Sequence, residues 1–127
     1  MSVLYVDSSA LVRLAVDEPG AEAVAALVGE AAEIVISVVA LVEVRRALAR
    51  VAPGYDPDDL LDQCTVIELQ ADVIGRAGIV EPASLRSLDA IHVASALSVV
   101  EDLDAFVTCD QRQASAARAA GLPVQVP

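Results

Sequence analysis

Short apolar runs alternate with helix-like segments along the chain, and this alternation constrains the fold more than any other feature of the sequence. The apolar runs, which we predict to be strands, are residues 2–6, 33–37, 65–69, 105–109 and 123–126. Between them, apolar residues recur at helical spacing in segments that begin near residues 8, 20, 38, 71, 84 and 111. This order predicts an α/β fold in which a central, mainly parallel β-sheet is flanked by helices.

The length of the chain indicates a single domain. It has 127 residues, of which 56% are apolar, and chains of about 100–200 residues usually form one domain with one core. The only loop-rich stretch contains Pro53, Gly54 and Pro57 and is too short to link two domains. We therefore expect residues 1–127 to form one domain.

The charged residues exclude several classes of protein. The chain has 8 basic residues, all of them arginine, against 19 acidic residues, and its net charge is −11. Any mechanism that needs a catalytic lysine is therefore excluded. The negative net charge works against a broad basic groove for nucleic acid. A base-stacking platform is not expected either, because the chain has only two tyrosines and one phenylalanine. An acidic surface suits a metal site or a basic partner protein.

Nothing in the sequence indicates a membrane protein or a secreted one. The longest nearly apolar stretch, residues 34–42, is far shorter than the roughly 20 residues of a membrane helix. The first residues, MSVLYVDSS, lack the positive segment of a signal peptide. Cys64 and Cys109 have no C-x-x-C spacing and fit buried residues in a reducing compartment. We expect a cytoplasmic protein without a disulfide.

Two carboxylates follow directly on predicted strands. Asp7 comes after the first apolar run, and Asp110 comes after the run at residues 105–109. In open α/β sheets, ligands bind outside the carboxyl ends of the strands. Both residues are therefore candidates for a functional site.

A third carboxylate, Asp89, interrupts an apolar helix face. Leu85, Val93 and Ala96 are its neighbours at helical spacing. A buried carboxylate persists when it binds a metal, pairs with a cation or stays protonated. Arg86, three residues earlier, leaves open a simple ion pair within the helix.

Glu43 lies on the helix that follows the second strand, beside Arg46 and Arg50 at helical spacing. One interpretation is a surface pair between glutamate and arginine, which stabilises a helix only slightly. The other is an acid beside two guanidinium groups that can reach phosphates.

Together, Asp7, Glu43, Asp89 and Asp110 would form an all-oxygen, negatively charged site at one end of a parallel sheet. Hard oxygen ligands suit Mg²⁺ or Mn²⁺, and a divalent cation would relieve the repulsion between the acids. His92 lies three residues after Asp89, but it is the only histidine. We assign it to packing or hydrogen bonding rather than to metal binding.

With these residues in view, the sequence resembles the PIN-domain family and, within it, the VapC toxins of bacterial toxin–antitoxin pairs. The order and spacing of several segments carry the resemblance: residues 3–14, 37–48, 85–97, 106–110 and 116–124. The resemblance implies a ribonuclease in which Asp7, Glu43, Asp89 and Asp110 hold Mg²⁺ or Mn²⁺ and act in catalysis. The implied reaction is metal-assisted hydrolysis of RNA phosphodiester bonds.

The resemblance also implies that hydroxyl side chains orient a carboxylate or a water molecule at the metal, namely those of Ser8, Ser9 and Thr108. It implies a cognate VapB-like antitoxin that occupies the site until it is degraded, and a homodimer of the toxin.

Three arginines are candidates for contacts with substrate phosphates. Arg46, Arg50 and Arg86 lie close to the predicted acids along the chain. This interpretation depends on their placement alone.

Other proteins with an acidic Mg²⁺ site on an α/β sheet fit less well. Receiver domains and haloacid-dehalogenase-like phosphotransferases use a lysine, and the second class has D-x-D where this chain has Asp7-Ser8-Ser9. Two alternatives remain open. One is a catalytically silent docking module of the same fold, and the other is a housekeeping nuclease of the PIN-domain family without an antitoxin.

Overall fold

Five parallel strands form the centre of the computed structural model, in the order β3-β2-β1-β4-β5. The strands are β1 (Ser2–Val6), β2 (Ala31–Ser37), β3 (Thr65–Ile67), β4 (Ala105–Val107) and β5 (Val124–Gln125). In the central strand, Leu4 is paired with Ile34 on one side and with Ala105 on the other. The structure describes residues 2–127, so Met1 of the expected 1–127 domain lies outside the described residues.

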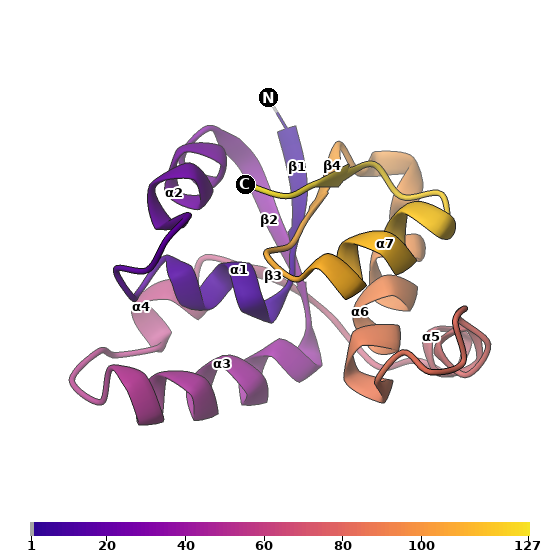
Figure 1. The fold of residues 1–127 in the computed structure, drawn as a ribbon, viewed down its shortest axis with the longest axis horizontal. Helices are drawn as coiled ribbons and strands as arrows, with labels where there is room; N and C mark the ends of the chain where they lie inside the picture. Colours follow the sequence, from indigo (N-terminus) through magenta and orange to yellow (C-terminus); the bar gives the residue numbers. More distant parts are fainter. Residues whose placement is uncertain (1) are drawn as a thin grey trace.

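Helices cover both faces of the sheet, as Figure 1 shows. On one side lie α1 (Ser8–Arg13), α2 (Ala21–Gly29), α3 (Val38–Val51) and α4 (Asp58–Leu61). On the other side lie α5 (Ala71–Ala77), α6 (Ser87–Leu97) and α7 (Gln111–Ala119). A 3-10 turn, Val100–Asp102, precedes β4. The predicted α/β fold with a parallel sheet flanked by helices is confirmed.

The sheet separates two apolar cores. Side chains alternate between the two faces of a strand, so Leu4 and Val6 pack with α1 to α4 while Tyr5 packs with α6 and α7. The ring of Tyr5 stacks on that of Phe106, with 5.1 Å between centroids and 3° between planes. Leu4, Tyr5 and Val6 of β1 are almost fully buried. Because both faces of this central strand are covered by helices, its sequence is a nearly continuous apolar run.

Some element boundaries differ from those predicted. The side chain of Asp7, not that of Ser8, caps α1 by accepting a hydrogen bond from the backbone N–H of Ala10. Strand β4 ends at Val107, so residues 108–109 form a turn before α7. Helix α4, which the sequence did not predict, is a single turn directly after the proline-rich loop.

Two smaller predictions also have an outcome. Cys64 and Cys109 are both free thiols, but they are half-buried rather than buried as predicted. Of the helices formed by residues 2–127, none combines the length and apolar character needed to cross a membrane.

Candidate active site

The four predicted acids lie at the carboxyl end of the sheet. Asp7 follows β1 directly, Asp110 follows the turn after β4, and Glu43 lies on α3, which begins immediately after β2. Asp89 lies in the first turn of α6. In Figure 1 the chain enters β1 at the top, so the lower end of the sheet is the edge where these elements meet.

Asp7 is the most buried of the four acids, with 3% of its surface exposed. Its Oδ1 accepts hydrogen bonds from Ser9 Oγ at 2.7 Å and from the N–H of Ala10 at 3.0 Å. Its Oδ2 accepts from Thr108 Oγ1 at 2.5 Å. Burial raises the pKa of Asp7, and the hydrogen bonds from Thr108 and Ser9 offset only part of that rise. A cation beside Asp7 would relieve this penalty.

Asp110 is tied to Asp7 through Thr108. The N–H of Asp110 donates to Thr108 Oγ1 at 3.0 Å, and that hydroxyl donates to Asp7. Asp110 Oδ1 also caps α7 by accepting from the N–H groups of Arg112 and Gln113 at 2.8 and 3.2 Å. Two helix caps therefore fix two of the acids by local backbone geometry.

Ser9 strengthens the same connection from α1. Its Oγ donates to Asp7 and accepts from the N–H of Cys109 at 3.1 Å. The turn after β4 is thus held against the start of α1, and the predicted hydroxyl residues Ser9 and Thr108 both lie beside the acids.

Arg86 bridges Asp89 and Asp110. Its Nε donates to Asp89 Oδ2 at 3.0 Å, and its Nη2 lies 3.6 Å from Asp110 Oδ2. The hydrogen bond and the charge of Asp89 raise the pKa of Arg86. The intrahelical ion pair that the sequence left open is therefore formed, and it extends to a second acid. The Arg86 side chain is nevertheless 72% exposed, so it remains accessible to a substrate.

Glu43 pairs with residues of two other elements. Its Oε1 accepts from Ser8 Oγ at 2.8 Å and lies 2.7 Å from His92 Nε2. Burial alone raises the pKa of Glu43, but the His92 and Ser8 hydrogen bonds and nearby positive charge outweigh it, so the pKa is lowered. Within residues 2–127, no hydrogen bond or ion pair joins Glu43 to Arg46 or Arg50, so the surface Glu–Arg pair considered from the sequence is wrong.

Sequence reasoning missed one residue of this network, Tyr5. Its hydroxyl lies 2.7 Å from His92 Nδ1, so His92 has a hydrogen-bond role, as predicted. The available signal was the tyrosine in a strand predicted to be buried, since a buried phenol needs a hydrogen-bond partner. The identity of that partner, 87 residues away, has no local signal.

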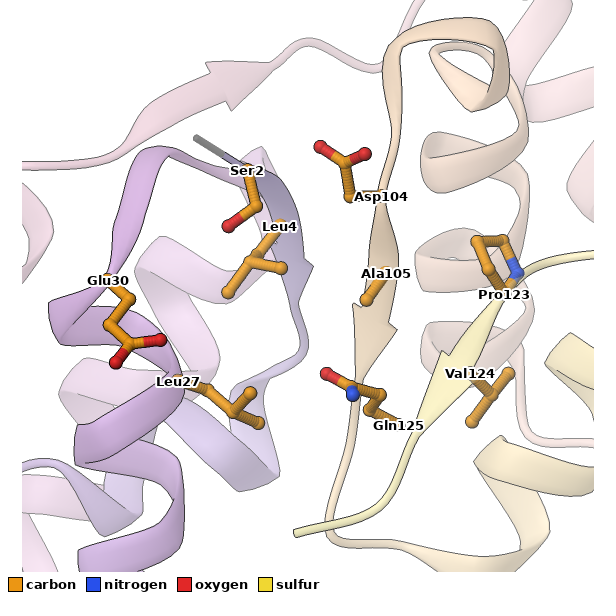
Figure 2. Close-up of a pocket in the computed structure, with 9 residues that line it drawn as sticks. All are labelled: Ser2, Leu4, Leu27, Glu30, Asp104, Ala105, Pro123, Val124 and Gln125. Carbon is orange, nitrogen blue, oxygen red and sulfur yellow. The ribbon is translucent and has the colours of Figure 1, made fainter.

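A cavity of about 320 Å³ lies away from the acids. Figure 2 shows Ser2, at the start of β1, together with Glu30 and Asp104 around it. Asp104 comes before β4, whereas Asp110 comes after it. The cavity is therefore at the opposite end of the strands, and the candidate active site is the carboxyl edge of the sheet.

The acids fit a magnesium ion by the chemistry of their donors. Across residues 2–127, no three Asp, Glu, His or Cys side chains lie close enough together to hold one metal ion. However, Mg²⁺ keeps several of its waters and often binds through only one or two carboxylates. Ser8 and His92 occupy only one oxygen of Glu43, Oε1. The donor set is all oxygen and negatively charged, which suits Mg²⁺ or Mn²⁺, but it is not a closed cage.

Comparisons with known proteins find similar sequences over nearly the whole chain. The family described as "PIN domain" matches residues 4–119. The chain is 37% identical over 132 residues to ribonuclease VapC47 of Mycobacterium tuberculosis, covering 98% of this chain and 97% of that protein.

Two solved structures have a similar fold. The crystal structure of VapC20 from M. tuberculosis, described as a toxin that cleaves the sarcin–ricin loop, gives a TM-score of 0.74 at 18% identity. That match covers 98% of this chain and 99% of VapC20. A toxin–antitoxin complex from Klebsiella pneumoniae gives a TM-score of 0.72 at 23% identity, covering 99% of this chain and 98% of the matched chain.

Proposed function

The chain belongs to the PIN-domain family, and from this membership we propose that it is the VapC-type toxin of a toxin–antitoxin pair. Its activity would be the hydrolysis of RNA phosphodiester bonds with the help of Mg²⁺ or Mn²⁺. Its similarity to ribonuclease VapC47 over nearly the full length supports this proposal. The observation that carries it is the placement of all four carboxylates at the carboxyl edge of the parallel sheet, where Thr108 and Arg86 link Asp7, Asp110 and Asp89.

Asp7, Glu43, Asp89 and Asp110 would hold the divalent cation, one or two of them directly and the others through its water molecules. When bound, the cation would lower the pKa of water and offset the negative charge that develops during phosphodiester cleavage.

The surrounding side chains keep these acids in place. Ser9 and Thr108 hold the two oxygens of Asp7, and Ser8 holds Glu43. Arg86 is exposed above Asp89 and Asp110 and is the arginine best placed to contact a substrate phosphate.

Arg46 and Arg50 are weaker candidates for RNA contacts. Both are exposed on α3, and their contact within the described residues is a hydrogen bond from Arg50 Nη1 to the Arg46 carbonyl at 3.5 Å. They remain available to a phosphate backbone that runs along the helix.

The proposed partner is a cognate VapB-like antitoxin. One solved structure with this fold is a toxin–antitoxin complex. A net charge of −11 and a set of acids at one edge favour a partner that presents a basic side chain. The homodimer and the cytoplasmic location stay predictions, and sedimentation of the purified protein tests the first.

The experiment that tests the function is cleavage of total cellular RNA by the purified, antitoxin-free protein, with new 5′ ends mapped by sequencing. Wild-type protein in Mg²⁺ is compared with Asp7→Asn protein and with wild-type protein in EDTA. Asparagine also caps helices well, so the variant is expected to fold. Discrete new ends that disappear in both controls would establish a metal-dependent ribonuclease and identify its substrate.

The remaining alternatives predict other outcomes. Identical maps for wild type and Asp7→Asn, despite measured Mg²⁺ binding, would support a catalytically silent docking module. Growth arrest on expression, relieved by the product of a neighbouring gene, distinguishes a toxin from a housekeeping nuclease.

A further inference from the structure

A buried chain of hydrogen bonds leads from the core to the candidate active site. His92, on α6, has 1% of its surface exposed. Its Nδ1 lies 2.7 Å from the hydroxyl of Tyr5 on β1, and its Nε2 lies 2.7 Å from Glu43 Oε1 on α3. Three elements that are distant in the sequence are thus connected through one imidazole ring.

The chemistry of the partners sets the direction of the hydrogen bond to Glu43. A carboxylate only accepts, so His92 Nε2 must carry a proton and donate it to Glu43. The Tyr5 hydroxyl pairs with the other ring nitrogen, Nδ1. Tyr5 keeps its proton, because burial and the nearby charge of Asp7 raise its pKa. Both nitrogens of the His92 ring are therefore held by protein groups, and Nε2 is held as the donor to Glu43.

The rings that form this chain are held rigidly. Tyr5 is fully buried and stacks on Phe106. The rings of Tyr5 and His92 meet edge to face, with 5.9 Å between centroids and 77° between planes. Neither ring can rotate without disturbing the core, so the position of His92 Nε2 is fixed by β1 and β4 rather than by α6 alone.

This chain determines which oxygen of Glu43 is available. Ser8 Oγ donates to the same Oε1 atom at 2.8 Å, so two donors hold one oxygen. In the described residues, Oε2 accepts no hydrogen bond from protein. The carboxylate is therefore oriented with one oxygen toward its donors and the other left for a ligand.

We propose that Tyr5 and His92 are positioning residues for Glu43: they orient its carboxylate for the reaction without touching RNA. The inference rests on the proposed function, because Glu43 must act in RNA hydrolysis for its orientation to matter. Removal of groups that hold a metal ligand in place typically reduces activity by about 10-fold to 100-fold.

The first part of the test is independent of activity. The chain has one histidine, so protein labelled with ¹⁵N-histidine gives the NMR signals of a single imidazole ring. We expect a protonated Nε2 that is hydrogen-bonded to Glu43 and an Nδ1 that is hydrogen-bonded to Tyr5. Tyr5→Phe should shift the Nδ1 resonance, whereas Tyr55→Phe, at the only other tyrosine, should not. A spectrum in which Nε2 carries no proton, or an unchanged Nδ1 resonance in Tyr5→Phe, would overturn the inference.

The second part measures RNA cleavage. Tyr5→Phe keeps the stacked ring, and we expect its kcat to fall about threefold to tenfold with little change in KM, while Tyr55→Phe matches the wild type. His92→Leu should lose about 10-fold or more in kcat, and His92→Gln, whose amide can donate to Glu43, should recover part of that loss. Circular dichroism shows whether each variant folds.

The two proposals fail in different ways. Wild-type protein that binds Mg²⁺ but cleaves no RNA would overturn the proposed function. Active wild-type protein with equal kcat in Tyr5→Phe and His92→Leu would overturn the positioning role alone.

Discussion

The buried carboxylate of Asp7 illustrates how one residue can serve both folding and function. Its side chain caps α1 and joins α1 to the turn after β4 through Ser9 and Thr108. Three donors surround it, yet burial still raises its pKa. The same side chain therefore organises the local backbone in a buried position that disfavours its charged form.

This conflict predicts a pH dependence of stability. Between the ordinary pKa of 3.8 and its raised value in the folded protein, Asp7 binds more protons when folded than when unfolded. The free energy of unfolding must therefore fall as pH rises through that window. As pH rises through this window in EDTA, the free energy of unfolding of Asp7→Asn protein should increase relative to that of wild type. The increase should be about 1.4 kcal/mol for each pKa unit of the shift. Urea unfolding of both proteins from about pH 4 to about pH 8 measures the difference.

Glu43 does not interfere with this measurement. Its folded pKa is lowered from the ordinary 4.5, so it contributes stability above its unfolded pKa that is lost as pH falls through the folded value. Because Glu43 is present in both proteins, its contribution cancels in the difference between them. A difference between wild type and Asp7→Asn that stays constant across the pH range would contradict a raised Asp7 pKa.

The acids could be found from the sequence because each breaks a local pattern. Asp7 and Asp110 end apolar runs, and Asp89 interrupts an apolar helix face. The partners of these acids were harder to predict. Helical spacing suggested Arg46 and Arg50 for Glu43, whereas the fold brings it His92, 49 residues away. Local periodicity describes one element, and contacts between elements depend on the packing of the whole sheet.

At the scale of elements, α3 links the core to the site. It begins directly after β2, its first turn is capped by Ser37, and it carries Glu43. Val44, the next residue, is fully buried, while Val42 is 61% exposed on the same helix. The two valines make a matched pair for testing how α3 is held.

Val44→Ala should lower the free energy of unfolding by about 2 kcal/mol, because two carbon groups leave the core and a cavity remains. Val42→Ala removes the same atoms from an exposed position, so its effect should stay below about 0.5 kcal/mol. Both variants change helix propensity equally, which leaves burial as the difference between them. Urea unfolding checks this, and equal losses would mean that α3 does not pack on the sheet through Val44.

Element boundaries were less predictable than element types. The strand predicted at residues 105–109 ends at Val107: the Thr108 hydroxyl turns to Asp7, although the Thr108 N–H still donates to the carbonyl of Gln125 on β5. Helix α4 was missed because Asp58–Leu61 is one turn and too short to show a helical period. At Thr108, a contact with a residue 101 positions away decides the local structure.

At the scale of the whole molecule, the negative charge distinguishes this chain from a protein with a basic nucleic-acid groove. Its net charge is −11, and all eight basic residues are arginines. RNA is itself a polyanion, so the long-range field opposes its approach even though Arg86 is exposed beside the acids. Attraction must be local, from the arginines and from a bound cation, while repulsion is spread over the surface.

The balance between these two effects predicts an unusual salt dependence. Proteins that bind nucleic acid through many phosphate contacts lose affinity steeply as salt increases. Here added salt should first weaken the long-range repulsion, since the screening length shortens from about 30 Å at 0.01 M to about 10 Å at 0.1 M salt. We expect kcat/KM for RNA to rise about threefold over that range at fixed free Mg²⁺. Glu101→Gln with Asp102→Asn, which neutralises two exposed acids, should start higher and rise less. A steep fall of kcat/KM in wild type would instead mean that the local arginine contacts dominate RNA binding.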